Sequence, residues 1–202
     1  MTISQDRPFI VFGYGSLIFK PPPHVKSKVA GFLKGYVRRF AQKSHDHRGT
    51  PESPGRVVTL VHKEDWDYFS GSDPFPDDDI VWGVAYTIDP AYAAEDGYTM
   101  ETLDIYSIDP TTNKEQVIIH GCYVGRNDNP SFIGSEPLDI LAERIWKSVG
   151  PSGANKDYLY KLASAVHELS PSSYDSHLFA LEVRLHPENI AKVRQLDSKS
   201  SQ

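Results

Sequence analysis

The run of residues best suited to binding chemistry is FIVFGYGSLIF, in which an apolar segment leads directly into a Gly-Tyr-Gly-Ser turn. Gly13 and Gly15 remove two Cβ atoms from one short bend, so the backbone there can adopt positive φ and a ligand can approach the main chain closely. A turn of this kind points several N–H groups into one concavity that suits a carboxylate or phosphate oxygen. The pattern predicts a small-anion site, and a plain chain-reversing turn is the alternative of equal weight.

Two familiar phosphate-binding motifs do not fit this turn. The segment GYGSLIFK lacks the Gly-Lys-Ser/Thr ending of the P-loop. Ile18 stands where the third glycine of the dinucleotide-binding pattern G-x-G-x-x-G would fall. Lys20 is then followed by three prolines, which cannot open a helix in the usual way.

A second polar cluster runs from His45 to Thr50 and could suggest a metal site, because His45 and His47 flank Asp46. On a strand, alternation would put both histidines on one face and Asp46 on the other, and no second ligand group is visible nearby. We therefore expect no metal here. The better interpretation is a polar loop held by hydrogen bonds among Asp46, Arg48 and the backbone.

The remaining candidate groups are single residues. Arg56 follows a Pro-Gly pair at the mouth of a strand, where its planar fork could clamp a carboxylate, and a surface salt bridge is equally compatible. Cys122 is interpreted as a small buried residue, because nothing local supplies a base partner. Three glutamates are interpreted as ordinary exposed charges: Glu52, Glu101 and Glu136.

Length and composition restrict the class of protein. At 202 residues the chain can bury a substantial core, and we expect a single domain over residues 1–202. The net charge of −6, without a basic stripe, argues against nucleic acid as a partner. A single cysteine fits a reducing compartment, the first residues lack a secretory pattern, and no apolar run is long enough to span a bilayer. We expect a cytoplasmic protein without membrane contact that handles a small molecule.

The elements that must position these groups are strands in the first two-thirds of the chain and helices in the last third. Runs rich in Val, Ile, Tyr or Phe predict strands at Phe9–Gly13, Ala30–Phe40, Arg56–His62, Ile80–Ile88, Leu103–Ile108 and Val117–Gly125. Apolar residues at helical spacing predict helices at Pro137–Val149, from Asn155 and from near Ser173. Because few helix-sized inserts separate the strands, we expect an α+β fold with a mostly antiparallel β-barrel and flanking C-terminal helices.

Two stretches are expected to lie outside the packed core. The segment 64–79, EDWDYFSGSDPFPDDD, is acidic and interrupted by Gly and Pro, which predicts a surface insertion. The polar tail, 197–202, is predicted to fray.

Five blocks of the sequence, taken together, resemble the ChaC-type γ-glutamylcyclotransferases, the glutathione-degrading branch of that family. The blocks are FGYGSL, SHDHRGTPESPGRVVTL, VWGVAY, YVGRNDNPSFIG and GPSGANKDYL. Their order and spacing match over roughly residues 8–182, and five ordered blocks are far more specific than one glycine turn. The resemblance implies a cyclotransferase-type β-barrel with flanking helices.

The resemblance also implies a reaction, the cleavage of glutathione to 5-oxoproline and Cys-Gly with no metal or organic cofactor. The α-amine of the γ-glutamyl group attacks its own side-chain carbonyl, so the reaction needs a folded substrate, an oxyanion partner and a base. By resemblance, the loop that holds the glutamyl group through its N–H groups consists of Gly13, Tyr14, Gly15, Ser16 and Leu17. The same comparison makes Arg56 and Tyr123 walls of the pocket.

The chain departs from the family pattern at the catalytic base. The family carries a helix whose end supplies a glutamate just before a Gly-Tyr pair. Between the matching residues Asp89–Ala91 and Gly97-Tyr98, about two to three turns of helix are missing here, and the nominal position of the base is Ala94. Glu95 is then the candidate base, displaced by one residue. The alternatives are that Glu95 or Asp96 is only a loop charge, or that the gene model is defective.

Two functions from different classes follow from the resemblance. The first is a glutathione-specific γ-glutamylcyclotransferase, a lyase of glutathione catabolism that is monomeric or weakly dimeric in the cytoplasm. The second is a catalytically impaired member that binds γ-glutamyl ligands through the turn and has lost the base.

Overall fold

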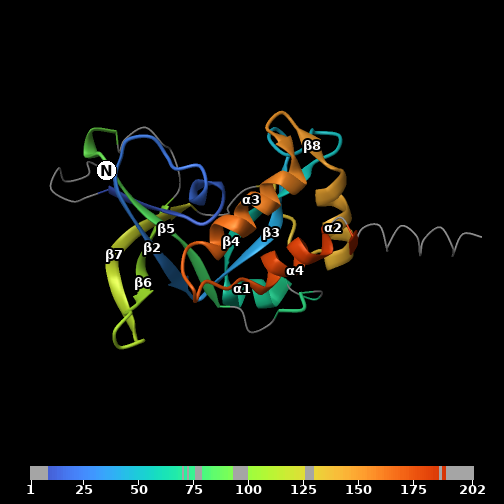
Figure 1. Ribbon diagram of the computed structural model, residues 1–202. Helices are drawn as coiled ribbons and strands as arrows, with labels where there is room; N and C mark the ends of the chain where they lie inside the picture. Colours follow the sequence, from blue (N-terminus) through green and yellow to red (C-terminus); the bar gives the residue numbers. More distant parts are fainter. Residues whose placement is uncertain are drawn as a thin grey trace, which may run out of the picture.

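The fold consists of antiparallel strands on one side and a group of helices on the other (Figure 1). The computed structural model describes residues 9–69, 71, 73–75, 79–92, 100–125, 130–186 and 188–189. Among these residues, no helix is long and apolar enough to cross a membrane. The α+β class is confirmed as a mixed α/β fold with antiparallel sheets.

The larger sheet is made of strands that are distant in sequence. Its order is β1 (Phe9–Gly13), β5 (Ile80–Ile88), β2 (Val25–Lys34), β6 (Met100–Ile108) and β7 (Glu115–Gly125). Successive neighbours in this order are antiparallel, and one parallel pair, Val11 with Tyr123, links β7 to β1. Phe12, Leu33 and Ile105 from this sheet share one buried cluster. Strand β1, which leads into the glycine turn, therefore has its neighbours on both sides supplied by distant parts of the chain.

The second sheet pairs β3 (Tyr36–Ser44) with β4 (Gly55–His62). We expected one strand from Ala30 to Phe40, but Gly35 adopts a φ of +74° and separates β2 from β3. A side chain at this left-handed position would be strained, so glycine permits the chain to turn from one sheet into the next.

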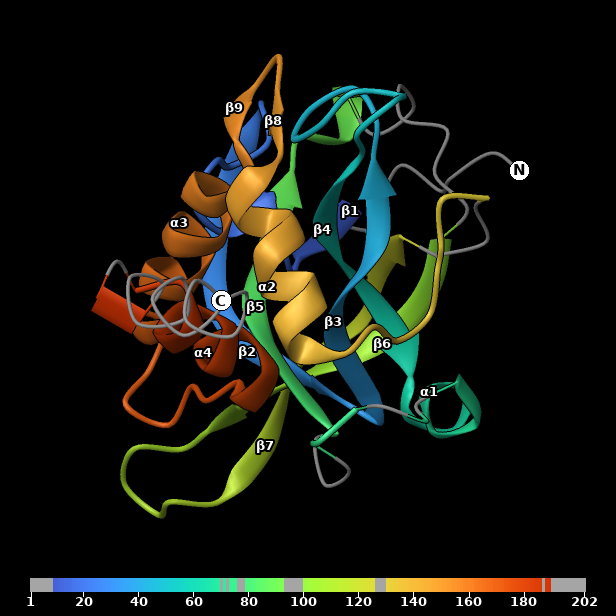
Figure 2. The ribbon, with the colours of Figure 1, turned by 90° about the vertical axis from the view of Figure 1, so that its right-hand side faces the viewer.

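Three helices cover the second sheet and form the other core of the molecule (Figure 2). They are α2 (Leu138–Lys147), α3 (Asn155–His167) and α4 (Ser176–Arg184), and the short hairpin of β8 (Val149–Gly150) and β9 (Gly153–Ala154) joins α2 to α3. Leu141, Ile145 and Leu162 pack in one buried cluster with Phe40 and Val58 of the second sheet. The apolar stripes predicted from the sequence are therefore the core-facing sides of these helices.

The third predicted helix begins three residues later than Ser173, at Ser176, because Asp175 caps it. The Asp175 carboxylate accepts a hydrogen bond from the Leu178 backbone N–H at 2.8 Å. Such a cap satisfies one of the N–H groups that the first turn of a helix leaves unpaired.

The acidic segment 64–79 is mostly exposed where the structure describes it, but it carries two packed side chains that we did not expect. It begins within helix α1 (Lys63–Phe69), which buries Trp66 against Val37 and Val61. The Trp66 indole N–H donates to the carboxylate of Asp73, which also pairs with Arg39. The sequence analysis missed these two side chains because the acidic composition hid one apolar anchor and one carboxylate with buried partners. The tail at 197–202 lies outside the described residues.

A buried histidine makes stability depend on pH. His177 of α4 accepts a hydrogen bond from the Phe40 N–H at its Nε2, at 3.2 Å. Burial, assisted by the nearby Arg39 charge, lowers the pKa of His177 to about 3. The folded state then keeps the ring neutral, whereas the unfolded chain binds a proton near pH 6.5.

We therefore predict that the free energy of unfolding falls as the pH is lowered from about 6.5 to 5, by up to about 1.4 kcal/mol per pH unit from this one group. The measurement is urea unfolding of wild type, His177→Gln and His120→Gln at several pH values. His177→Gln should flatten the slope, and His120→Gln should retain it because the His120 side chain is 80% exposed. Identical slopes in wild type and His177→Gln would contradict the assignment.

Candidate active site

The glycine turn connects β1 to a short 3₁₀ helix, η1 (Ser16–Ile18). The Ile18 N–H donates to the Gly15 carbonyl oxygen at 3.0 Å, and the Lys20 N–H donates to that of Ser16 at 2.8 Å. Within the described part of the chain, the N–H groups of Gly15, Ser16 and Leu17 meet no hydrogen-bond acceptor. The carbonyl oxygens of Gly15 and Ser16 are thus used within the turn, in which Gly15 is buried and Ser16 is exposed.

Neither glycine of the turn has the positive φ that we expected from the sequence. Gly15 has a φ of −126° and a ψ of −127°, outside the main regions that residues with a side chain occupy. A Cβ on Gly13 would lie 2.7 Å from the Leu17 Cβ, and one on Gly15 would lie 3.0 Å from a Val58 methyl carbon. The glycines therefore allow close approach of the chain to itself, a different reason from the one predicted.

Tyr86 of β5 holds the far end of the turn. Its hydroxyl group donates a hydrogen bond to the Leu17 carbonyl oxygen at 2.7 Å. Burial raises the pKa of Tyr86, so the hydroxyl stays protonated and continues to act as a donor at neutral pH.

Tyr158 of α3 lies directly beside the turn, and the sequence analysis did not select it. Its hydroxyl oxygen would be 3.3 Å from a Cβ on Gly15, so it contacts the turn backbone closely. Burial raises the pKa of Tyr158 well above its ordinary value, against a hydrogen bond from the Val58 backbone, and the hydroxyl is therefore protonated. The block GPSGANKDYL contained Tyr158, but only packing of α3 against the turn reveals its position.

Arg38 of β3 supports the near end of the turn. Its Nη1 donates to the carbonyl oxygens of Tyr14 and Trp82, each at 2.9 Å. The sequence analysis missed Arg38 because a strand arginine is ordinarily an exposed charge.

Arg56 clamps a carboxylate, as one interpretation had it, but the carboxylate belongs to this chain. Its Nε and Nη2 donate to the two oxygens of Glu136 at 2.6 and 2.9 Å. Arg56 is only 4% exposed, so the alternative of a surface salt bridge is wrong, as is the interpretation of Glu136 as an ordinary exposed charge. The planar guanidinium fork is thus occupied by a structural partner, and a role as pocket wall stays a prediction.

Asn155, at the first turn of α3, joins that helix to β4. Its side-chain oxygen accepts from the Arg56 N–H at 2.6 Å, and its side-chain nitrogen donates to the Arg56 carbonyl oxygen at 2.7 Å. A fully buried amide thus satisfies both backbone groups of one strand residue. This pairing fixes the start of the helix that carries Tyr158.

The polar segment after β3 forms a loop, as predicted, although its main partners differ. The Arg48 N–H donates to the Ser44 hydroxyl at 2.9 Å, and the guanidinium Nη1 donates to the Ala154 carbonyl oxygen at 3.1 Å. Asp46 lies 3.8 Å from His47, and both are exposed. Among the described residues, no group of three or more His, Cys, Asp or Glu side chains could hold a metal ion.

Of two further predicted site residues, the structure describes one by its backbone only and the other not at all. Glu95 lies outside the described residues. Tyr123 is placed by its backbone alone, which pairs with Val11 in β1, four residues before the Gly15 turn residue. The segment that leads toward Glu95 starts after Tyr92, whose ring stacks on His24 with centroids 3.5 Å apart. Cys122 pairs by its backbone with Leu103, and its predicted burial stays a prediction.

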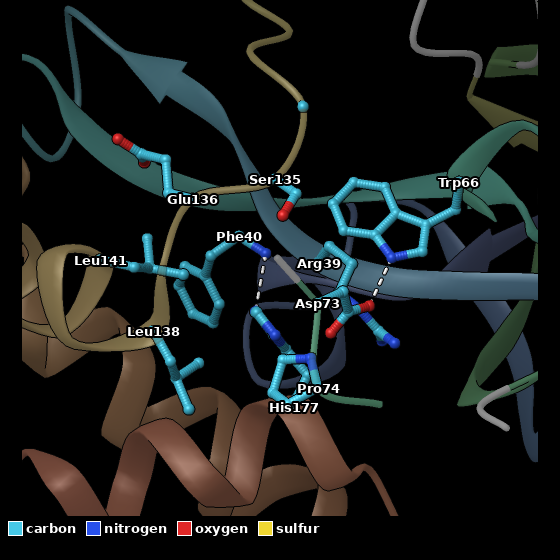
Figure 3. Close-up of a pocket in the computed structure, with 11 residues that line it drawn as sticks. Arg39, Phe40, Trp66, Asp73, Pro74, Ser135, Glu136, Leu138, Leu141 and His177 are labelled. Carbon is cyan, nitrogen blue, oxygen red and sulfur yellow. Dashed lines mark hydrogen bonds and ion pairs between the residues drawn. The ribbon is translucent and has the colours of Figure 1, made fainter. Parts of the chain in front are cut away.

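A separate small cavity lies on the Arg39 side of β3 (Figure 3). Its volume is about 10 Å³, and Arg39, Phe40, Asp73, Glu136 and His177 are among the residues that line it. This volume suits about one water molecule, not a peptide. None of the residues from Gly13 to Leu17 lines it, so the cavity and the turn are different features.

Comparison with known proteins agrees with this architecture. The family description "ChaC-like protein" matches residues 9–187. The chain is 40% identical to the glutathione-specific γ-glutamylcyclotransferase of Schizosaccharomyces pombe over 196 residues, covering 91% of this chain and 95% of that protein. It is 36% identical to the Saccharomyces cerevisiae protein of the same name, over 79% of this chain and 85% of that one.

A solved structure shares the fold as well. The crystal structure of a γ-glutamyl cyclotransferase specific to glutathione from yeast superposes with a TM-score of 0.70 at 33% identity, covering 93% of this chain and all of that one. The chain therefore belongs to the ChaC-like family, and the resemblance drawn from the five sequence blocks is confirmed.

We predict that Gly15→Val damages the turn, because the new side chain would meet Val58 and the Tyr158 hydroxyl. Overpacking of this kind costs about 1–3 kcal/mol of unfolding free energy. Urea unfolding gives the stability, and calorimetric titration with glutathione should show affinity weakened by about tenfold or more. The control is Gly71→Val, since a Cβ on Gly71 meets nothing within 4 Å. Wild-type stability and affinity in Gly15→Val would contradict the tight packing of the turn.

Proposed function

We propose that this chain is a glutathione-specific γ-glutamylcyclotransferase that converts glutathione to 5-oxoproline and Cys-Gly. The observation that carries the proposal is the 40% identity, over nearly the full length of both chains, to a relative that bears this name. The glycine turn adds support from this chain's own geometry, because its successive N–H groups suit the oxygens of a γ-glutamyl group.

The turn and its neighbours would act first by orienting the substrate. Gly15, Ser16 and Leu17 donate N–H groups to the glutamyl moiety, and Tyr86 holds this part of the turn in place. The protonated Tyr158 hydroxyl lies within reach of the same moiety. Holding the amine close to the γ-carbonyl carbon converts ring closure into a well-oriented intramolecular reaction.

The bond changes balance without any further reactant. The α-amine nitrogen forms a bond to the γ-carbonyl carbon, and the tetrahedral oxyanion is stabilised by hydrogen-bond donors. The bond from that carbon to the cysteine nitrogen then breaks. A base takes the proton from the attacking amine and returns it to the leaving nitrogen, and Glu95 is the proposed base.

The proposal also covers the barrel, the border of the pocket, the cellular location and the oligomeric state. The strands β1-β5-β2-β6-β7 would form the cyclotransferase-type barrel, with the Val11–Tyr123 pair as its closure. Arg56, through its backbone and its pairing with Glu136, and Tyr123 would border the pocket. We place the protein in the cytoplasm as a monomer or weak homodimer without a cofactor.

The direct test is product formation by the purified chain with millimolar glutathione, followed by mass spectrometry. We expect 5-oxoproline and Cys-Gly in equal amounts, well above a control without protein. Binding of glutathione without either product would overturn the enzymatic proposal and leave the binding protein described above as the function.

A second prediction concerns the base. Glu95→Gln should lower kcat by about 100-fold or more while the affinity for glutathione stays within about twofold, because the amide cannot carry the proton. The matched control is Asp96→Asn, which removes the neighbouring charge and should leave kcat nearly unchanged. Full activity of Glu95→Gln would remove this residue from the mechanism.

A further inference from the structure

We propose that Arg38 is a positioning residue for substrate binding, which sets the shape of the glycine turn from behind without touching the substrate. The inference rests on the proposed function, since it takes the turn as the site of the γ-glutamyl group. It adds a residue that none of the sequence blocks pointed to and links that site to helix α4.

The contacts of Arg38 reach three separate elements. Nη1 donates to the Tyr14 carbonyl oxygen in the turn and to the Trp82 carbonyl oxygen in β5, both at 2.9 Å. Nε donates to Asp175 at 2.7 Å. One guanidinium group thus fixes the turn relative to the strand that pairs with β1 and to the start of α4.

The Tyr14 carbonyl is the critical contact, because of where it stands in the peptide chain. It belongs to the same peptide plane as the Gly15 N–H, so holding the oxygen also fixes the direction of that N–H. The oxygen points toward Arg38, and in a trans peptide the N–H therefore points in the opposite direction within the same plane. Without this contact, the direction of the Gly15 N–H would depend on the permissive torsions of glycine and on the packing of Val58 and Tyr158 against Gly15.

Asp175 keeps the guanidinium in this orientation. Both Nε and Nη2 lie 2.7 Å from its Oδ2, and the Nη2 approach is an ion pair without hydrogen-bond alignment. The other oxygen, Oδ1, caps α4 through the Leu178 N–H. Burial would raise the pKa of Asp175, but the Arg38 charge and the Leu178 N–H outweigh it and hold the pKa below its ordinary value.

The neighbouring Arg39 provides an internal control. It is equally buried and pairs with its own aspartate, Asp73, at 2.8 Å. Because successive strand residues point to opposite faces, its guanidinium lies over the Trp66 ring and donates to the Phe75 carbonyl oxygen, away from Tyr14. Damage to Arg39 should therefore cost stability without altering the turn.

The experiment compares Arg38→Lys with Arg39→Lys in the full chain, measuring KM and kcat for glutathione together with urea unfolding. Lysine keeps the charge but cannot reproduce the fork that serves Tyr14, Trp82 and Asp175 at once. We expect both variants to lose stability, and only Arg38→Lys to raise KM, by about tenfold or more. Equal changes of KM in the two variants, or an unchanged KM in Arg38→Lys, would overturn the proposal.

Asp175→Asn is the second variant, chosen because asparagine caps helices as well as aspartate does. It should retain α4 and still raise KM, because the guanidinium loses its charged partner. Wild-type KM in this variant would overturn the link to α4, whatever the result for Arg38→Lys.

A readout independent of catalysis separates this proposal from the proposed function. Amide hydrogen exchange at residues 14–18 should accelerate by about tenfold or more in Arg38→Lys and stay near wild type in Arg39→Lys. If wild type makes no 5-oxoproline, the proposed function fails while the exchange result still decides whether Arg38 orders the turn. Equal exchange in both variants would show that it does not.

Discussion

The buried pairing of Arg38 with Asp175 is the interaction on which the glycine turn and the two halves of the molecule depend. A guanidinium group at 1% exposure is costly unless nearly all its donors are satisfied, and here a carboxylate and two carbonyl oxygens share that task. The requirement for several partners at once is what gives the pair its specificity. Only one arrangement of β1, β5 and α4 around β3 provides them all.

Two adjacent residues of β3, Arg38 and Arg39, each form a buried ion pair with an aspartate, on opposite faces of the strand. Arg38 connects the larger sheet and α4, whereas Arg39 connects α1 through Asp73 and Trp66. Strand alternation places the two charges on different faces, so one short stretch of backbone joins the layers on either side. Asn155 then joins α3 to β4 through the backbone of Arg56, and Arg48 joins the loop after β3 to the Ala154 carbonyl oxygen at the start of α3. The turn is consequently held by rigid elements and not by its own short sequence.

The sequence predicted the parts of this structure that local patterns determine. The strand Ile80–Ile88 and the start of α3 at Asn155 were predicted correctly, since an apolar run or a helical stripe is visible within one window. The buried charges were not, because their partners lie far away in the chain: Asp175 is 137 residues from Arg38, and Glu136 is 80 residues from Arg56. From sequence alone, an arginine is expected at the surface, because the carboxylate that allows its burial is brought close only by the fold.

The same distribution of contacts separates substrate binding from proton transfer. The described contacts of the turn come from β3, β4, β5 and α3, with α4 acting through Arg38. Glu95, the base that we propose, belongs in the sequence to the stretch between β5 and β6, outside the described residues. Binding depends on where these rigid elements place the turn, whereas a base must in addition lie within hydrogen-bond reach of the proton that it moves.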